Sequence, residues 1–159
     1  VYARLRPAEE NSGKLVALVR WEARAQAQRE GIGLLLTDGP PGTGCPVIAS
    51  LGNADLALVV TEPTPSGLHD LERALALCRH FRVPAMVCVN KFDLNSDLEK
   101  RVRALCAVSQ TAVTESIPFD ESVPRAIQQG LPLVEFDHGP ASQAVSAVWQ
   151  QVKGKLMTE

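Results

Sequence analysis

The sequence predicts an α/β fold, in which a mostly parallel β-sheet is flanked by helices. Apolar runs of strand length alternate with segments of helical periodicity; the runs are residues 32–38, 54–62 and 83–90. Hydrophobic residues make up 45% of the chain and charged residues 21%, a composition typical of a globular core. Aromatic residues are only 4%, so aliphatic residues and Ala supply the apolar content, as in sheets buried on both faces.

The length and charge of the chain narrow its possible functions. Its 159 residues suit one domain, residues 1–159. The net charge of −2 argues against nucleic-acid binding through bulk electrostatics. The sequence shows no signal-peptide pattern and no apolar run long enough to span a membrane, so we expect a cytoplasmic protein.

The first third of the chain is expected to hold two strands and a helix. Residues 1–6 fit a short strand. A helix is expected over residues 11–31, with Asn11 or Ser12 as its N-cap, because apolar residues recur on one face. The run at residues 32–38 ends in an acid, as expected for a buried parallel strand.

The middle of the chain repeats the strand–helix order. A Gly/Pro-rich loop covers residues 39–46, and a second buried strand covers residues 54–62. Residues 68–81 carry a stripe of leucines at helical spacing. Residues 83–90 then predict a third buried strand.

The last third is predicted to be mainly helical. Helices are expected over residues 96–110 and 140–157, each with one apolar face. Between them we expect a short strand within residues 113–120, a small helix that ends at Gly130, and another strand at residues 132–136.

Polar residues, Pro or Gly follow four successive predicted strands. Asp38, Glu62 and Asn90 end three of them, and residues 118–120 follow the fourth. Ligands of parallel sheets bind at the carboxyl ends of the strands. The sequence therefore predicts one shared site at this edge.

The segment DGPPGTG, residues 38–44, contains part of a phosphate-binding pattern. In a standard P-loop a lysine follows the last glycine and meets the phosphates, but here Cys45 takes that place. An Asp after a buried strand can instead bind Mg²⁺ through water, and a glycine lets a backbone N–H approach a phosphate. The alternative is a tight strand-to-helix connection with Asp38 as the helix cap.

Two further segments have both a functional and a structural interpretation. In VNKFD, Asn90 and Asp93 are spaced to bind a purine edge, or they only cap backbone N–H groups. The loop TEPTPSGLHD, residues 61–70, is typical of loops that respond to a nucleotide, or it is a rigid turn in which Ser66 caps the next helix. We expect His69 to be a surface residue.

The four cysteines form no C-x-x-C pair and so carry no local zinc or iron–sulfur pattern. We expect Cys78, Cys88 and Cys106 to be small core residues with reduced thiols. Cys45 lies in the glycine-rich loop, where packing is the expected role and redox sensitivity the alternative.

Together these motifs resemble the MinD/ParA/Mrp superfamily of deviant-Walker P-loop ATPases. The resemblance covers roughly residues 2–150 and depends on D-x-P-P-G, T-E-P-T-x-S-G-L-H-D-L and N-K-x-D-L-N. It is closest to the branch with an inserted ferredoxin-type [4Fe–4S] domain, which EENSGKLVALVR and ESIPFD also fit. The implied fold is that of a SIMIBI-type P-loop NTPase without its N-terminal P-loop strand.

The resemblance implies ATP and Mg²⁺ as cofactors and assigns a role to each site residue. Segment 38–44 then corresponds to switch II rather than to a P-loop. Asp38 is implied to bind Mg²⁺ through water and Gly42 to sense the γ-phosphate. The residues implied to contact the nucleotide are Asn90 at adenine, Asp93, Pro118 and Phe119 near the base and ribose, and Pro41 and Glu62 in the loops.

The family's K-G-G-x-G-K-[ST] motif and its ferredoxin cysteines do not occur in this sequence. We therefore expect the chain to be the C-terminal portion of such an ATPase. Its nucleotide binding is best measured together with the upstream part. The resemblance implies a homodimer, a redox or iron–sulfur partner protein, and [4Fe–4S] clusters in the upstream domain only. The family's P-loop strand lies between the strands at 32–37 and 56–61, so we expect either a gap there or direct pairing of those two strands.

Three functions remain open on the sequence alone. The first is an ATPase portion that is inactive by itself, because phosphoryl transfer depends on the phosphate-binding lysine and its loop. The second is an interaction module that keeps the fold but not catalysis. The third is a GTP-binding switch, suggested by N-K-x-D, although G-P-P-G after Asp38 is one residue longer than the GTPase pattern.

Overall fold

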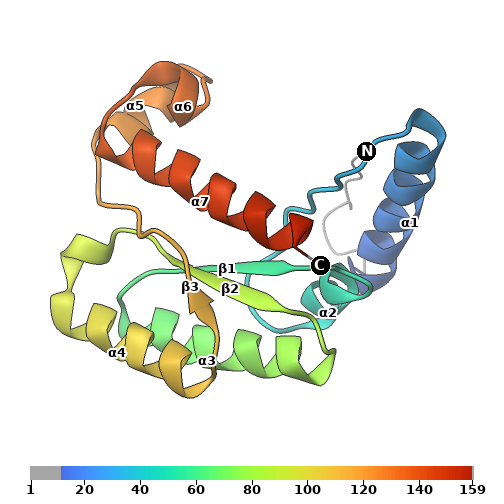
Figure 1. Ribbon diagram of the computed structural model, residues 1–159, viewed down its shortest axis with the longest axis horizontal. Helices are drawn as coiled ribbons and strands as arrows, with labels where there is room; N and C mark the ends of the chain where they lie inside the picture. Colours follow the sequence, from blue (N-terminus) through green and yellow to red (C-terminus); the bar gives the residue numbers. More distant parts are fainter. Residues whose placement is uncertain (1–11, 159) are drawn as a thin grey trace. The chain divides into compact units, whose positions relative to one another are not determined.

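The computed structural model describes residues 12–158, which divide into two compact units with a boundary between Ala54 and Asp55. The predicted strand at residues 1–6 and a cap at Asn11 lie outside the described residues. In Figure 1 the first unit contains α1 and α2, and the second contains the sheet and the remaining helices.

In the first unit, helix α1 (Ser12–Glu30) packs against helix α2 (Cys45–Leu51). The Arg20 guanidinium on α1 donates Nη1 hydrogen bonds to the carbonyls of Ala49, at 2.8 Å, and Gly52. These carbonyls lie at the carboxyl end of α2, where a cation also interacts favourably with the helix dipole. Burial, with a smaller contribution from Arg24, lowers the pKa of Arg20 from its ordinary value. Arg20 therefore joins the two helices.

The predicted strand at residues 32–38 is wrong, because this run has no regular structure. Its apolar side chains are exposed, with Ile32 at 52% and Leu36 at 81%. A strand needs a neighbour that hydrogen-bonds along its length. At the start of this run, the Ile32 N–H donates a hydrogen bond to the Ala27 carbonyl at 2.9 Å. The segment contributes no strand to the sheet, so the expected direct pairing with residues 56–61 is also wrong.

The second unit contains a three-stranded parallel sheet in the order β1-β2-β3. The strands are β1 (Ala57–Thr61), β2 (Ala85–Val89) and β3 (Ala112–Val113). In the register, Val59 pairs with Val87, and Val87 pairs with Val113. The α/β class and the strands predicted at 54–62 and 83–90 are confirmed.

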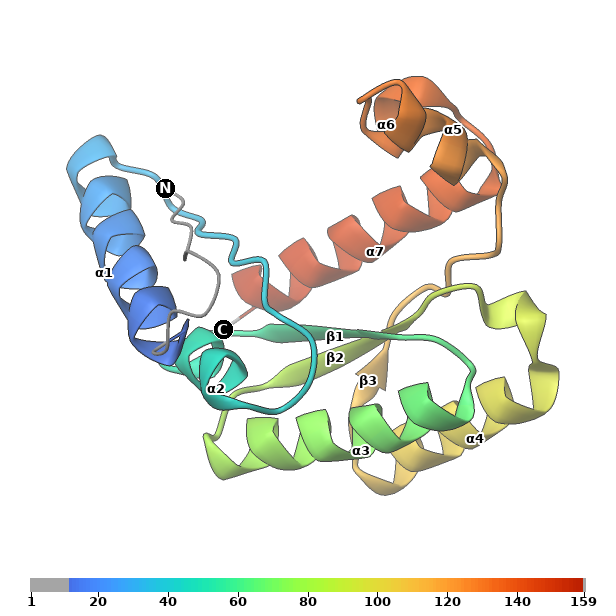
Figure 2. The ribbon, with the colours of Figure 1, turned by 180° about the vertical axis from the view of Figure 1, so that it is seen from behind.

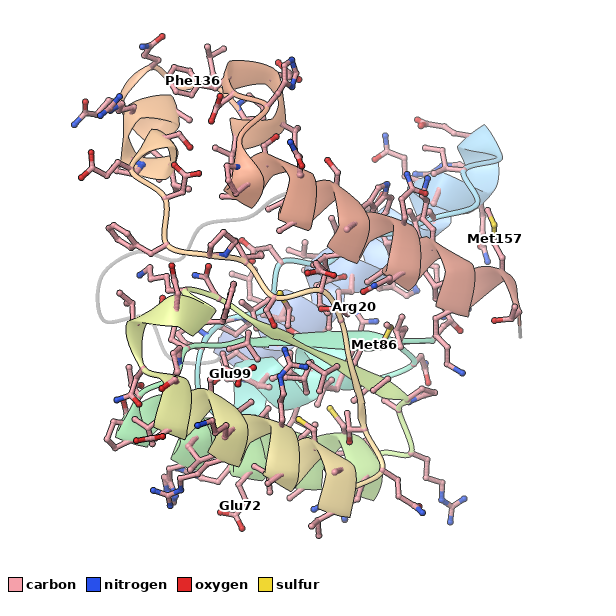
Figure 3. All side chains as sticks on the ribbon, turned by 60° about the vertical axis from the view of Figure 1, so that its left-hand side comes forward. Arg20, Glu72, Met86, Glu99, Phe136 and Met157 are labelled. Atoms are coloured by element: carbon pink, nitrogen blue, oxygen red, sulfur yellow. The ribbon has the colours of Figure 1, made fainter. Side chains whose placement is uncertain are left out.

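Helices cover both faces of this sheet (Figures 1 and 2). Helices α3 (Pro65–His80) and α4 (Ser96–Val108) lie on one face, and α7 (Pro140–Met157) lies on the other. Met86, labelled in Figure 3, belongs to the core cluster between the sheet and α7. The buried residues of the α3–α4 side are Leu71, Leu75, Val87, Val89, Val102 and Cys106, and those of the α7 side are Met86, Cys88, Val148 and Val152.

Three short helices complete the second unit: η1 (Phe92–Leu94), α5 (Ser122–Gln128) and α6 (Leu133–Phe136). The predicted strand at 132–136 is wrong, because these residues form α6. The N–H groups of Glu135 and Phe136 both donate to the Pro132 carbonyl, at 3.0 Å each, which closes a helical turn. A segment as short as PLVEF fits either a strand or a helical turn, so periodicity could not separate them.

Within residues 12–158, no helix combines the length and the mean hydropathy that a bilayer span requires.

Candidate functional site

The carboxyl ends of the three strands meet at one edge of the sheet. The Asn90 N–H donates to the Thr61 carbonyl at 2.7 Å, which joins the ends of β1 and β2. The Ile117 N–H donates to the Val89 carbonyl at 2.9 Å, and Asn90 and Ile117 form a parallel bridge. The residues that follow the three strands are therefore neighbours, as the strand-end argument predicted for Glu62, Asn90 and Pro118.

Glu62 contacts two residues at the end of β2. Its Oε1 accepts a hydrogen bond from Asn90 Nδ2 at 3.3 Å and forms an ion pair with Lys91 Nζ at 2.8 Å. The Glu62 and Lys91 side chains are 40% and 39% exposed, so the ion pair is partly open to solvent. The Glu62 carboxylate, which was predicted to bind the cofactor, therefore contacts the loop that follows β2.

Lys91 has a backbone conformation that is uncommon for a residue with a side chain. Its φ is +53°, in the left-handed region. Such residues persist where surrounding contacts hold them, and they cluster at functional sites. The ion pair with Glu62 is such a contact. Lys91 was not among the site residues predicted from the sequence. Its positive charge after one strand and the negative charge of Glu62 after the preceding strand could have indicated the ion pair.

The loop between β1 and α3 is a tight turn built around Gly67. The Gly67 N–H donates to Thr64 Oγ1 at 2.9 Å, and Thr61 Oγ1 donates to the Gly67 carbonyl at 3.0 Å. Thr64 is therefore the helix cap, and the predicted cap at Ser66 is wrong. A Cβ on residue 67 would meet the Glu62 carbonyl oxygen and both threonine hydroxyls.

Asp93 joins the loop after β2 to the segment after β3. Its Oδ1 accepts a hydrogen bond from the Phe119 N–H at 2.8 Å. The Phe119 ring is 51% exposed, and Pro118 is half-buried. The alternative that these side chains cap backbone N–H groups is confirmed for Asp93, at the Phe119 N–H. The cap of α4 itself is Asn95, whose Oδ1 accepts from the Leu98 N–H.

Asp120 closes the same segment. Its Oδ1 accepts a hydrogen bond from the Ser122 N–H at 2.8 Å. This backbone hydrogen bond, followed by the Ser122 hydroxyl, lowers the pKa of Asp120 from its ordinary value. The carboxylate is thereby stabilised in its charged form at the start of α5.

Asp38, Pro41 and Gly42 belong to the first unit, whereas the strand-end residues belong to the second. Asp38 is exposed, in a segment without regular structure. Gly44, rather than Asp38, precedes α2 as its N-cap, so the helix-cap alternative for Asp38 is wrong. Gly42 has a φ of +89°, and no atom lies within 4 Å of the position that a Cβ would take. The backbone of Gly42 is thus open to close approach by a ligand.

The cysteines differ in their surroundings. Cys78, Cys88 and Cys106 are buried as predicted, and burial raises the pKa of each thiol. Cys45 is exposed, so its predicted packing role is wrong. In the described part of the chain, no group of three or more His, Cys, Asp or Glu residues is arranged to hold a metal ion. Within these residues, the ligand set of an iron–sulfur cluster is therefore not assembled.

The chain is similar in sequence to archaeal proteins. An uncharacterized protein of Methanocaldococcus jannaschii is 28% identical over 153 residues, which cover 96% of this chain and 50% of that protein. An uncharacterized ATP-binding protein of the same organism is 25% identical over 122 residues, which cover 76% of this chain and 46% of that protein. The iron–sulfur cluster carrier protein of Pyrococcus horikoshii is also 25% identical, over 77% of this chain and 45% of that protein.

The chain is also similar in structure to MinD proteins. The cell division ATPase MinD of Pyrococcus furiosus superposes with a TM-score of 0.72 and 17% identity, over 91% of this chain and 59% of that one. MinD of Pyrococcus horikoshii, solved with Mg-ADP, gives 0.62 and 19% identity over 72% of this chain and 48% of that one. At these identities the structures show the fold alone, and the parallel sheet with its helices is that of MinD.

No protein-family model matches the chain. It spans about half the length of the relatives that it matches. Its fold and its relatives together confirm the resemblance to the MinD/ParA/Mrp superfamily of ATPases.

Proposed function

We propose that this chain forms the switch and base-binding portion of an ATP-binding, iron–sulfur-associated ATPase. The observation that carries the proposal is the position of Asn90, which is fixed where three parallel strand ends meet. Ligands of open parallel sheets bind at this edge. A carboxamide both donates and accepts hydrogen bonds, which suits the edge of a purine.

In this proposal the residues of the second unit hold the base and ribose. Asn90 binds adenine, with Phe119 and Pro118 beside the base and ribose. The exposed ring of Phe119 offers an apolar surface for such contact. Asp93 keeps this segment in place through the Phe119 N–H. Glu62, which the resemblance implies to be at the nucleotide, also lies behind Asn90, and its hydrogen bond to Asn90 Nδ2 supports a positioning role.

The loop of the first unit is assigned to the phosphates and Mg²⁺. Asp38 would hold Mg²⁺ through water, and Gly42, with Pro41 before it, would bring its N–H to the γ-phosphate. The positive φ of Gly42 and the open space beside it support this assignment. Bound Mg²⁺ neutralises the charge of the phosphates.

The remaining assignments concern the whole protein and rest on the relatives. We propose that this chain works with a P-loop half and with [4Fe–4S] clusters held outside it, in a cytoplasmic homodimer that serves a redox or iron–sulfur partner. The name of the Pyrococcus carrier protein supports the iron–sulfur role. We assign no catalysis to this chain alone, because its sequence contains no phosphate-binding lysine motif.

Titration calorimetry with Mg-ATP and Mg-GTP tests the proposal, on this chain and on a form extended upstream in its own reading frame. We expect the extended form to bind ATP more tightly than GTP, and Asn90→Ala to weaken ATP binding by about tenfold, since one base hydrogen bond is lost. Gln28→Ala, which removes an exposed carboxamide from α1, serves as a control. Failure of the extended form to bind either nucleotide would contradict the nucleotide function.

An interaction module is the second candidate. Strand β1 is at the edge of the three-stranded sheet, and its Leu58 and Val60 side chains are 38% and 58% exposed. An edge strand with exposed apolar residues is a surface on which another strand can pair. This candidate takes precedence if the calorimetry detects no nucleotide binding.

A further inference from the structure

We propose that Glu62 selects adenine over guanine by fixing the orientation of the Asn90 carboxamide. This inference rests on the proposed nucleotide function and adds a specificity-determining residue to it. Glu62 acts through Asn90 and is therefore a positioning residue.

The contact of Glu62 determines how the Asn90 amide is turned. An ionised carboxylate only accepts hydrogen bonds, so the atom of Asn90 that faces Glu62 Oε1 is the donor Nδ2, at 3.3 Å. Lys91 Nζ contacts the same oxygen at 2.8 Å and holds the carboxylate in place. The backbone of Asn90 is fixed as well, by its N–H bond to the Thr61 carbonyl. The amide therefore has one favoured orientation.

This orientation leaves an acceptor, Asn90 Oδ1, for the base. Adenine carries an amino donor at C6, whereas guanine carries an acceptor oxygen there. Oδ1 would accept from the adenine amino group, but it would face the guanine oxygen with no hydrogen between them. Turning the amide to suit guanine would bring Oδ1 against the Glu62 carboxylate, which is unfavourable because neither group donates.

Asp93 provides an independent reason for the same preference. Guanine presents two adjacent donors, N1–H and the C2 amino group, which a carboxylate binds best with both of its oxygens. In this chain Asp93 Oδ1 already accepts from the Phe119 N–H at 2.8 Å. A two-oxygen contact with guanine would require Oδ1 to accept a second hydrogen bond beside that of Phe119, whereas adenine has no donor at these positions and requires none.

The test compares the affinities of Mg-ATP and Mg-GTP for the upstream-extended protein and its Glu62 variants. Glu62→Ala frees the amide to turn, and Glu62→Gln keeps the size of the side chain but can itself donate. We expect each variant to lower the ATP-over-GTP affinity ratio by about tenfold, the value of one mispaired hydrogen bond. Glu72→Ala removes the same charge from α3, where Glu72 projects away from the sheet (Figure 3), and is expected to leave the ratio unchanged.

The outcomes separate this inference from the proposed function. A fallen ratio in both Glu62 variants, with circular dichroism spectra like that of the parent, supports the role of Glu62. If the ATP-over-GTP affinity ratio is unchanged while ATP still binds, the role of Glu62 in base selection is overturned. If the affinities for ATP and GTP fall equally, that role is also overturned, and Glu62 has a structural role instead. If the parent protein binds neither nucleotide, the proposed function fails and this inference fails with it. If Glu62→Ala does not fold, the isosteric Glu62→Gln decides.

Discussion

At the scale of single residues, Gly67 determines how tightly the loop between β1 and α3 can turn. Its N–H and carbonyl are both bound by threonine hydroxyls, from Thr64 and Thr61. There is no room beside its Cα, since a Cβ would meet the Glu62 carbonyl oxygen. The glycine is thus required by a close approach of backbone to backbone. Its hydrogen bonds to Thr61 and Thr64 also fix the chain on either side of Glu62.

We expect Gly67→Ala to lower the free energy of unfolding by about 1–3 kcal/mol, because the added methyl group forces the loop apart. Urea denaturation followed by circular dichroism measures the change. Gly154→Ala is the control, since Gly154 lies in α7 with nothing within 4 Å of its Cβ position. That substitution is expected to be neutral or stabilising, by up to about 1 kcal/mol. Equal effects of the two substitutions would show that the loop tolerates a side chain.

At the scale of elements, a few side chains connect loops that are distant in the sequence. Asp93, at η1, binds the Phe119 N–H after β3, across 26 positions of the chain. The Phe92 N–H donates to the Ile117 carbonyl at 3.2 Å in the same region. The two loops therefore form one structural piece beside Asn90.

We expect Asp93→Ala to speed hydrogen exchange of the Phe119 amide by about tenfold, because that amide loses a charged acceptor. Exchange measured by NMR detects the change at a single position. Asp97→Ala removes an equal charge from the first turn of α4, where Asp97 is ion-paired with Lys100 at 3.5 Å, and is the control. Unaltered protection of Phe119 in Asp93→Ala would mean that other contacts hold the loop.

At the scale of the whole molecule, the core is distributed unevenly between the two units. Among the described residues, every buried hydrophobic side chain except Leu51 belongs to the second unit. That unit has a cluster on each face of its sheet. The first unit has two packed helices and an exposed apolar run. Burial of apolar surface is the main source of stability, so most of it is expected in the second unit.

We expect residues 55–159 to fold without residues 1–54, because the second unit contains both core clusters. The isolated piece should unfold in one cooperative urea transition, as small single domains do. Circular dichroism and tryptophan fluorescence, from Trp149 on α7, should give the same midpoint. A broad transition, or different midpoints for the two signals, would show that the second unit depends on the first.

The sequence by itself determined the strands and helices whose patterns are long and local. The runs at 54–62 and 83–90 became β1 and β2, and residues 140–157 form α7 as predicted. The strands were predictable because a short, continuous apolar run is typical of a strand buried on both faces, and the helix because its apolar residues recur on one face. The superfamily resemblance likewise came from motifs readable in the chain.

Only the tertiary structure decided which apolar runs found a partner and which polar side chains meet. Within residues 12–158, the run at 32–38 has strand composition but pairs with no strand, and residues 133–136 form α6. The contacts of Glu62 with Asn90 and Lys91 cross 28 or more positions of the chain. A strand's hydrogen bonds and a carboxylate's partners come from distant residues, so local sequence patterns do not contain them.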